Sequence, residues 1–224
     1  MFDSAIEVLI FDSDGVLVKT ENNNSVNYPT KLFVDLVSAD RTINFPPWNG
    51  TDWISMLQKA GFDIHDPEKL KIASERMSLW DNGKNKRFGW VEEIIPVLST
   101  KFKLALLTNN SRANIAKYLG CQIDCFSAVR TYENLVGELK PSPVGILEIC
   151  EELNIHPSKA IMIGDSEEDL IAASKAGANS IIISWNNPSQ WFTTLKKIFE
   201  SDLLPRNILN IFTKPKQFID FFQL

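Results

Sequence analysis

Short unbroken apolar runs alternate along the chain with stretches that have helical spacing. The runs have the length and composition of buried parallel strands, which are apolar on both faces. We expect strands at 8–11, 104–107, 160–163 and 180–183, a weaker one at 126–129 and a last edge strand at 208–212. Helices are expected at 91–99, 111–119, 144–153 and 167–176, with another at the C-terminus. Because strands that alternate with helices form parallel sheets with right-handed crossovers, the pattern predicts an α/β core.

The stretch 19–88 departs from this alternation, since it carries no strand signal. Three helices are expected there, at 28–37, 52–60 and from 66 to about 80. Asp66 can cap the third of them, with a proline at the first helical position. We therefore predict a core of residues 1–18 and 89–224, with a small helical insert between its first and second strands.

Polar residues follow three of the predicted strands, at the point where each strand ends. They are Asp12 and Asp14 after the first, Thr108 and Asn109 after the second, and Asp165 after a later one. Lys140 precedes a Pro-Ser-Pro turn, and Asp169 lies one helical turn beyond Asp165, on the same face. Since open α/β sheets bind ligands at the carboxyl ends of their strands, these side chains are expected to form one site.

Several of these residues also have a plainer interpretation. The segment 12–15 could be an Asx-rich turn, and Asp165 could simply cap the helix that follows it. Asp169 could be an exposed helix acid, and Lys140 a solvated loop lysine. The basic run 84–87 is either a solvated face or a contact for a second anionic group on a substrate.

The four polar motifs together resemble those of the haloacid dehalogenase superfamily. The matching stretches are FDSDGVL at 11–17, LTN at 107–109, KPSP at 140–143 and IGDSEED at 163–169. The tail DLIAASKAGA at 169–178 is similar to the phosphoglycolate-phosphatase-like branch of that superfamily. The resemblance implies a Rossmann-like parallel-sheet core with a small all-helical cap domain inserted after the first strand. The insert matches this cap in position and helical character alone.

The resemblance implies a Mg²⁺-dependent phosphomonoester hydrolase that acts through an aspartyl-phosphate. Asp12, ionised at neutral pH, can attack phosphorus without further activation. Asp14 is the expected general acid, which gives the leaving alkoxide its proton and takes one from the attacking water. Thr108 and Lys140 are expected to bind the phosphoryl oxygens, with Asn109 orienting them. The implied metal ligands are Asp12, Asp165 and the Asp14 backbone carbonyl, with Asp169 in support.

Two other functions use the same motifs. A phosphoglucomutase-like phosphoryl transfer needs the same residues, and depends on how well the cap excludes water. A catalytically silent binding module could keep the fold without the activity. Asp14 favours ester hydrolysis, because family members that cleave carbon–halogen or phosphorus–carbon bonds usually lack an aspartate there. The substrate is expected to be a small phosphorylated metabolite, recognised by the cap.

The amino-acid composition indicates which kinds of binding partner and which cellular compartment to expect. Twenty-three Lys and Arg against 28 Asp and Glu leave a net charge of −5, so no nucleic-acid partner is expected. Three cysteines without a CxxC pair favour a reducing cytoplasm, and the absence of a long apolar stretch predicts no membrane partner. The protein is expected to be a monomer or a homodimer. Two features depart from the family pattern: Arg87–Trp90 replaces a Pro-Gly turn, and Trp185–Leu204 is long and aromatic.

Overall fold

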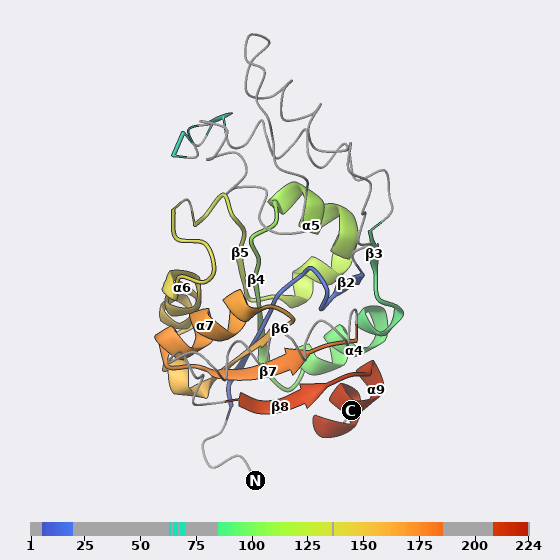
Figure 1. Cartoon of the computed structure of the whole chain (residues 1–224). Helices are drawn as coiled ribbons and strands as arrows, with labels where there is room; N and C mark the ends of the chain where they lie inside the picture. The colour runs from blue at the N-terminus through green and yellow to red at the C-terminus, as the bar shows by residue number, and fades with distance from the viewer. Residues whose placement is uncertain are drawn as a thin grey trace. The chain divides into compact units, whose positions relative to one another are not determined.

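A six-stranded sheet, parallel throughout, organises the structure (Figure 1). The computed structural model describes residues 6–19, 63, 65–66, 68–69, 85–135, 137–185 and 208–223. The strands are β1 (Val8–Phe11), β4 (Lys103–Leu107), β5 (Ala128–Arg130), β6 (Ala160–Gly164), β7 (Asn179–Ile183) and β8 (Ile208–Phe212). They are arranged in the order β5-β4-β1-β6-β7-β8. The predicted α/β core with a parallel sheet is confirmed.

Helices connect these strands as the sequence predicts. They are α4 (Gly89–Ser99), α5 (Arg112–Leu119), α6 (Val144–Glu152), α7 (Glu167–Ala176) and α9 (Pro215–Phe221), with two short 3₁₀ segments at Gly120–Cys125 and Pro157–Lys159. Ser111 caps α5 by accepting a hydrogen bond from the Asn114 backbone N–H. Gly177 ends α7 in the left-handed conformation that suits a glycine. Within the described residues, no helix has both the length and the hydropathy needed to cross a membrane.

The central strand is apolar throughout because both of its faces are buried. Leu9 and Phe11 pack on one side of the sheet, in a cluster that includes residues of α4 and α9. Val8 and Ile10 pack on the other side, in a cluster with residues of α6 and α7. Alternate side chains of a strand point to opposite faces, so an unbroken apolar run fits a strand covered by helices on both sides.

The chain divides into two compact units, residues 1–20 with 85–224 and residues 21–84. The antiparallel strands β2 (Val18–Lys19) and β3 (Lys86–Arg87) join the two places where the chain leaves and re-enters the larger unit. These strands are too short for the sequence to reveal. The predicted helices at 28–37, 52–60 and 66–80 lie outside the described residues, except for a few positions near 66. There Asp66 accepts hydrogen bonds from two backbone N–H groups, as expected of a capping residue.

Aromatic packing explains one departure from the family pattern. Phe88 and Trp90, which stand where a Pro-Gly turn was expected, both contact Trp185, with ring centroids 6.2 and 5.6 Å apart. Phe218 of α9 packs against Trp90 and Trp185. The aromatic residues therefore extend the core to the start of α4, where the chain re-enters the larger unit. Beyond Trp185, the rest of the segment to Leu204 lies outside the described residues.

The approach of α6 to the sheet gives a test of this packing. A Cβ on Gly145 would lie 2.5 Å from Cδ1 of Leu107 and 2.9 Å from Cδ1 of Leu135, both buried. Helix propensity alone would make Gly145→Ala stabilising, but the crowding opposes it. We expect the variant to lower the free energy of unfolding by about 1–2 kcal/mol in urea denaturation.

Gly89→Ala is the matched control, because a Cβ there would meet no atom within 4 Å at the start of α4. We expect it to leave stability unchanged or raise it by about 0.5 kcal/mol. Equal stabilisation by the two substitutions would contradict the close contact between α6 and β4.

Candidate active site

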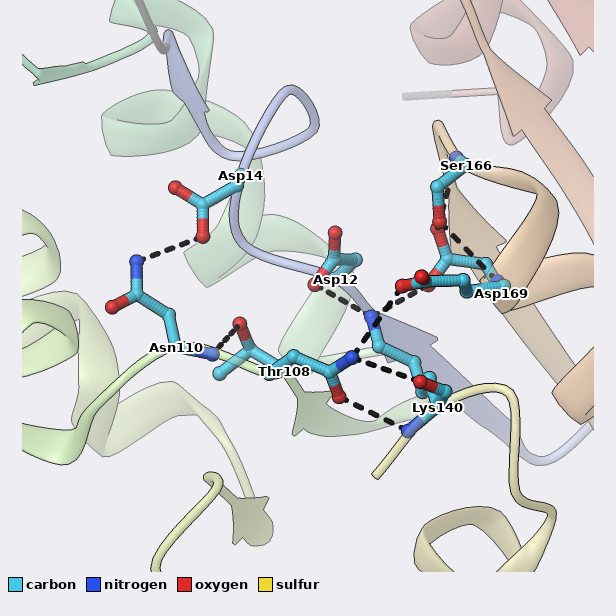
Figure 2. Close-up of polar contacts among 9 residues, drawn as sticks. Asp12, Asp14, Thr108, Asn110, Lys140, Ser166 and Asp169 are labelled. Carbon is cyan, nitrogen blue, oxygen red and sulfur yellow. Dashed lines mark hydrogen bonds and ion pairs between the residues drawn. The ribbon is translucent and has the colours of Figure 1, made fainter. Parts of the chain in front are cut away.

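The ammonium group of Lys140 is buried between two carboxylates at the carboxyl edge of the sheet (Figure 2). Its Nζ lies 2.8 Å from Oδ1 of Asp12 and 2.6 Å from Oδ1 of Asp169. Only 3% of the Lys140 side chain is exposed, which excludes a solvated loop lysine. Burial disfavours the ammonium, but the two carboxylates outweigh this and raise the pKa of Lys140. Lys140 is therefore a permanent cation at neutral pH.

Asn109 holds the backbone of Lys140 from the end of β4. Its Oδ1 accepts a hydrogen bond from the Lys140 backbone N–H at 3.0 Å, and its Nδ2 donates to the Lys140 carbonyl at 3.0 Å. This two-point contact joins positions 31 residues apart in the chain. It sets where the lysine side chain begins, and so how it reaches Asp12.

Three aspartates form an acidic cluster around this lysine. Asp12, Asp165 and Asp169 each offer a carboxylate oxygen, and these atoms lie within 4.8 Å of one another. Backbone pairing creates the cluster, since the Asp12 N–H donates to the carbonyl of Ile163, two residues before Asp165. Carboxylate oxygens are the ligands that Mg²⁺ prefers in proteins.

The electrostatics of the cluster favour a bound cation. Burial, together with Asp169 and Asp14, raises the pKa of Asp12 from 3.8 to about 7, although Lys140 opposes the shift. Burial is also the main reason that the pKa of Asp165 lies well above its usual value, and the charges of Asp12 and Asp169 raise it further. One lysine thus does not neutralise these acids. A divalent cation fits this donor set, because it would supply the missing positive charge.

Asp169 supports the cluster rather than lying exposed on its helix. Its side chain is fully buried, with Oδ1 paired to Lys140. Its Oδ2 accepts hydrogen bonds from the backbone N–H and the hydroxyl of Ser166, at 3.0 and 2.6 Å. Ser166 in turn caps α7, so the interpretation of Asp165 as the helix cap is wrong.

Gly15 brings the turn after β1 against Asp165. Its φ of +74° lies in the left-handed region, and a Cβ there would lie 1.8 Å from Oδ2 of Asp165. Only glycine allows both the backbone conformation and this approach. The Asp-Gly turn is therefore part of the wall that encloses the acidic cluster.

Asp14 takes a different direction from Asp12, toward the end of β4 (Figure 2). Its Oδ2 accepts a hydrogen bond from Nδ2 of Asn110 at 2.8 Å. The backbone N–H of Asn110 also donates to Oγ1 of Thr108 at 3.0 Å, which leaves the buried Thr108 hydroxyl its proton to donate. Sequence reasoning missed Asn110, although it directly follows the Thr-Asn motif.

Most of the sequence matches one protein family. The model of the haloacid dehalogenase-like hydrolases matches residues 9–183, which span the acidic cluster and every predicted site residue. The chain belongs to this family. Haloacid dehalogenase-like members related to it include phosphatases, as the resemblance implied.

Individual relatives agree with this placement. A phosphoglycolate phosphatase of Psychrobacter arcticus is 40% identical over 87 residues, which are 38% of this chain and 37% of that protein. The pyrophosphatase PpaX of Oceanobacillus iheyensis is 25% identical over 220 residues, 93% of this chain and 96% of that protein. The fold of a haloacid dehalogenase-like hydrolase from Streptococcus pneumoniae superposes with a TM-score of 0.64 at 18% identity, over 97% of this chain and 99% of that one.

Removing one negative charge from the acidic cluster tests its electrostatics. The folded pKa of Asp12 lies above its ordinary value of 3.8, so the folded state binds a proton that the unfolded state releases. This contribution to stability is present below about pH 4 and is lost as the pH rises to about 7. At pH 8, we expect Asp12→Asn to raise the free energy of unfolding of the metal-free protein by about 2–4 kcal/mol. Urea denaturation in EDTA measures this gain, which should shrink toward pH 4.

Asp220→Asn is the matched control, since Asp220 is an exposed acid of α9 that pairs with Lys216. It should show no comparable gain at pH 8. An Asp12→Asn variant that is no more stable than the parent at pH 8, in the absence of metal, would contradict the excess of buried negative charge.

Proposed function

We propose that this hydrolase removes the phosphoryl group of a small phosphorylated metabolite through an aspartyl-phosphate on Asp12, with Mg²⁺ as cofactor. The observation that carries the proposal is the carboxylate of Asp12, which the buried Lys140 ammonium holds at the end of β1. The charge of Lys140 lets an anionic phosphate approach this carboxylate, and the ion pair fixes its orientation. With Mg²⁺ bound, this carboxylate would be held as its anion, so it would need no separate base.

The reaction has two balanced steps. In the first, an oxygen of Asp12 bonds to phosphorus while the bond to the leaving oxygen breaks, and Asp14 gives that oxygen its proton. In the second, water attacks phosphorus, its proton passes to Asp14, and the bond between Asp12 and phosphorus breaks. Asp14 is thus restored with its proton, and Asp12 as a carboxylate. The two carboxylates have separate roles because they point to different partners, Lys140 and Asn110.

The phosphoryl oxygens are assigned to Thr108 and Lys140. The Thr108 hydroxyl accepts from a backbone N–H and keeps its own proton to donate, while Lys140 supplies positive charge. Asn109 keeps Lys140 in place. These groups neutralise the charge that spreads over the phosphoryl oxygens as the group is transferred.

Mg²⁺ would be held by the carboxylates of Asp12 and Asp165 and by the backbone carbonyl of Asp14. When bound, it would neutralise the acidic cluster and polarise the phosphoryl group. Asp169 acts through Lys140 and Ser166, since both of its oxygens are engaged by them. The residues that supply oxygen ligands thus come from the ends of β1 and β6.

The names of the relatives suggest the first substrates to test. Phosphoglycolate is chosen because of the name of the phosphoglycolate phosphatase, and inorganic pyrophosphate because of the name of the pyrophosphatase PpaX. Sugar monophosphates test the phosphoglucomutase-like alternative. The cytoplasmic location and the monomeric or homodimeric state remain predictions, as does the role of the cap at 19–88 in substrate choice.

We expect purified protein to release phosphate from p-nitrophenyl phosphate and from at least one metabolite of this panel, in the presence of Mg²⁺. EDTA should abolish the release and added Mg²⁺ restore it. Asp12→Asn should lower kcat by at least about 10³-fold, because an amide is not a nucleophile at phosphorus. Colorimetric phosphate detection measures all three effects.

Asp220→Asn, far from the acidic cluster in sequence, should keep full activity. If the protein interconverts sugar monophosphates without releasing phosphate, its activity is phosphoryl transfer and not hydrolysis. If the Mg²⁺-loaded protein acts on no compound of the panel, the result favours a catalytically silent binding module.

A further inference from the structure

The side-chain amide of Asn110 has an orientation that its neighbours determine. Its Oδ1 accepts hydrogen bonds from the Ser111 backbone N–H at 2.7 Å and from Nδ2 of Asn114 at 2.8 Å. A backbone N–H can only donate, so the atom that faces it must be the amide oxygen. The NH₂ group of Asn110 therefore faces Asp14, to which it donates at 2.8 Å.

The groups that hold Asn110 belong to the first turn of α5. Ser111 caps this helix, and Asn114 lies within its first turn and bonds to the Ser111 hydroxyl through its backbone N–H. Asn110 is also bound through its own backbone, which donates to Thr108 and accepts from the Tyr132 N–H. A rigid helix end and two loops thus fix the donor that meets Asp14.

We propose that Asn110, held by Asn114, is the positioning residue for the proton donor of the reaction. The inference rests on the proposed function, in which Asp14 protonates the leaving oxygen. A free aspartate side chain samples several rotamers, and only some of them direct an oxygen at the leaving group. The bond from Asn110 to Oδ2 selects one orientation, and directs Asp14 away from the Asp12–Lys140 ion pair (Figure 2).

The proposal predicts an effect that depends on the leaving group. An alkyl phosphate releases a basic alkoxide that needs the proton, whereas p-nitrophenyl phosphate releases a stable anion that does not. The value of kcat/KM reports the steps up to departure of the leaving group, so it isolates this proton transfer. We expect Asn110→Ala to lower kcat/KM about 10- to 100-fold for an alkyl phosphate, and less than about threefold for p-nitrophenyl phosphate.

The second step adds an independent readout. Asp14 takes the proton of the attacking water there, so a misplaced Asp14 slows hydrolysis of the aspartyl-phosphate. With p-nitrophenyl phosphate, Asn110→Ala should therefore release a burst of nitrophenol close to one per enzyme molecule, followed by a slow steady rate. The parent protein should show a smaller burst.

A double variant tests whether Asn110 acts through Asp14. In an Asp14→Asn background, Asn110→Ala should change kcat/KM for the alkyl phosphate by less than about twofold, because the group that it positions is already lost. Asn114→Ala should show a weaker form of the same leaving-group dependence. Asn179→Ala is the matched control, since Asn179, at the start of β7, has an amide that donates to the carbonyls of Ser158 and Ala160. This variant should leave kcat/KM unchanged for both substrates.

Equal losses of kcat/KM for the two substrates in Asn110→Ala would overturn the proposal, since they indicate a structural role alone. Unchanged hydrolysis of the alkyl phosphate would overturn it as well, and faster hydrolysis would show that the bond withdraws Asp14 from the reaction. Parent protein without Mg²⁺-dependent phosphatase activity would instead overturn the proposed function itself.

Discussion

The structure depends on one buried cation, the ammonium of Lys140, which lies among carboxylates that could not share a site without it. It contacts Asp12 at the end of β1 and Asp169 in α7, while Asn109 at the end of β4 holds its backbone. Loss of the lysine from these buried ion pairs would cost about 3–5 kcal/mol, because the carboxylates would be left uncompensated. The ion pairs therefore join three distant segments into one site.

The charges around this cation do not balance. Four aspartates lie near one lysine, and burial keeps the pKa values of Asp12 and Asp165 high. Buried acids in excess of their counter-charges destabilise a fold, and such a cluster is typical of a site where function opposes stability. A divalent cation would balance the charge of the acidic cluster. The same imbalance that weakens the metal-free protein prepares it to bind a metal ion.

Geometry then separates two aspartates that are only two residues apart. The turn after β1 closes through Gly15, whose left-handed backbone lies against Asp165. Asp12 meets Lys140, while Asp14 meets the amide of Asn110 at the start of α5. Each carboxylate thus has a partner suited to its proposed role, a cation for the nucleophile and a neutral donor for the general acid. The helix end that orients Asn110 extends the site beyond the four motifs.

The sequence alone predicted the strand and helix pattern of the core and the residues of the acidic cluster, because apolar periodicity and strand-end polarity are local signals. It did not reveal that Asp169 and Lys140 are buried, that Ser166 rather than Asp165 caps α7, or that Asn110 meets Asp14. These features join residues 3 to 96 positions apart. The Ser166 cap follows from a local capping box with Asp169. Burial and the contact between Asn110 and Asp14 are decided only by the packing of separate elements, since they depend on how these elements meet in space.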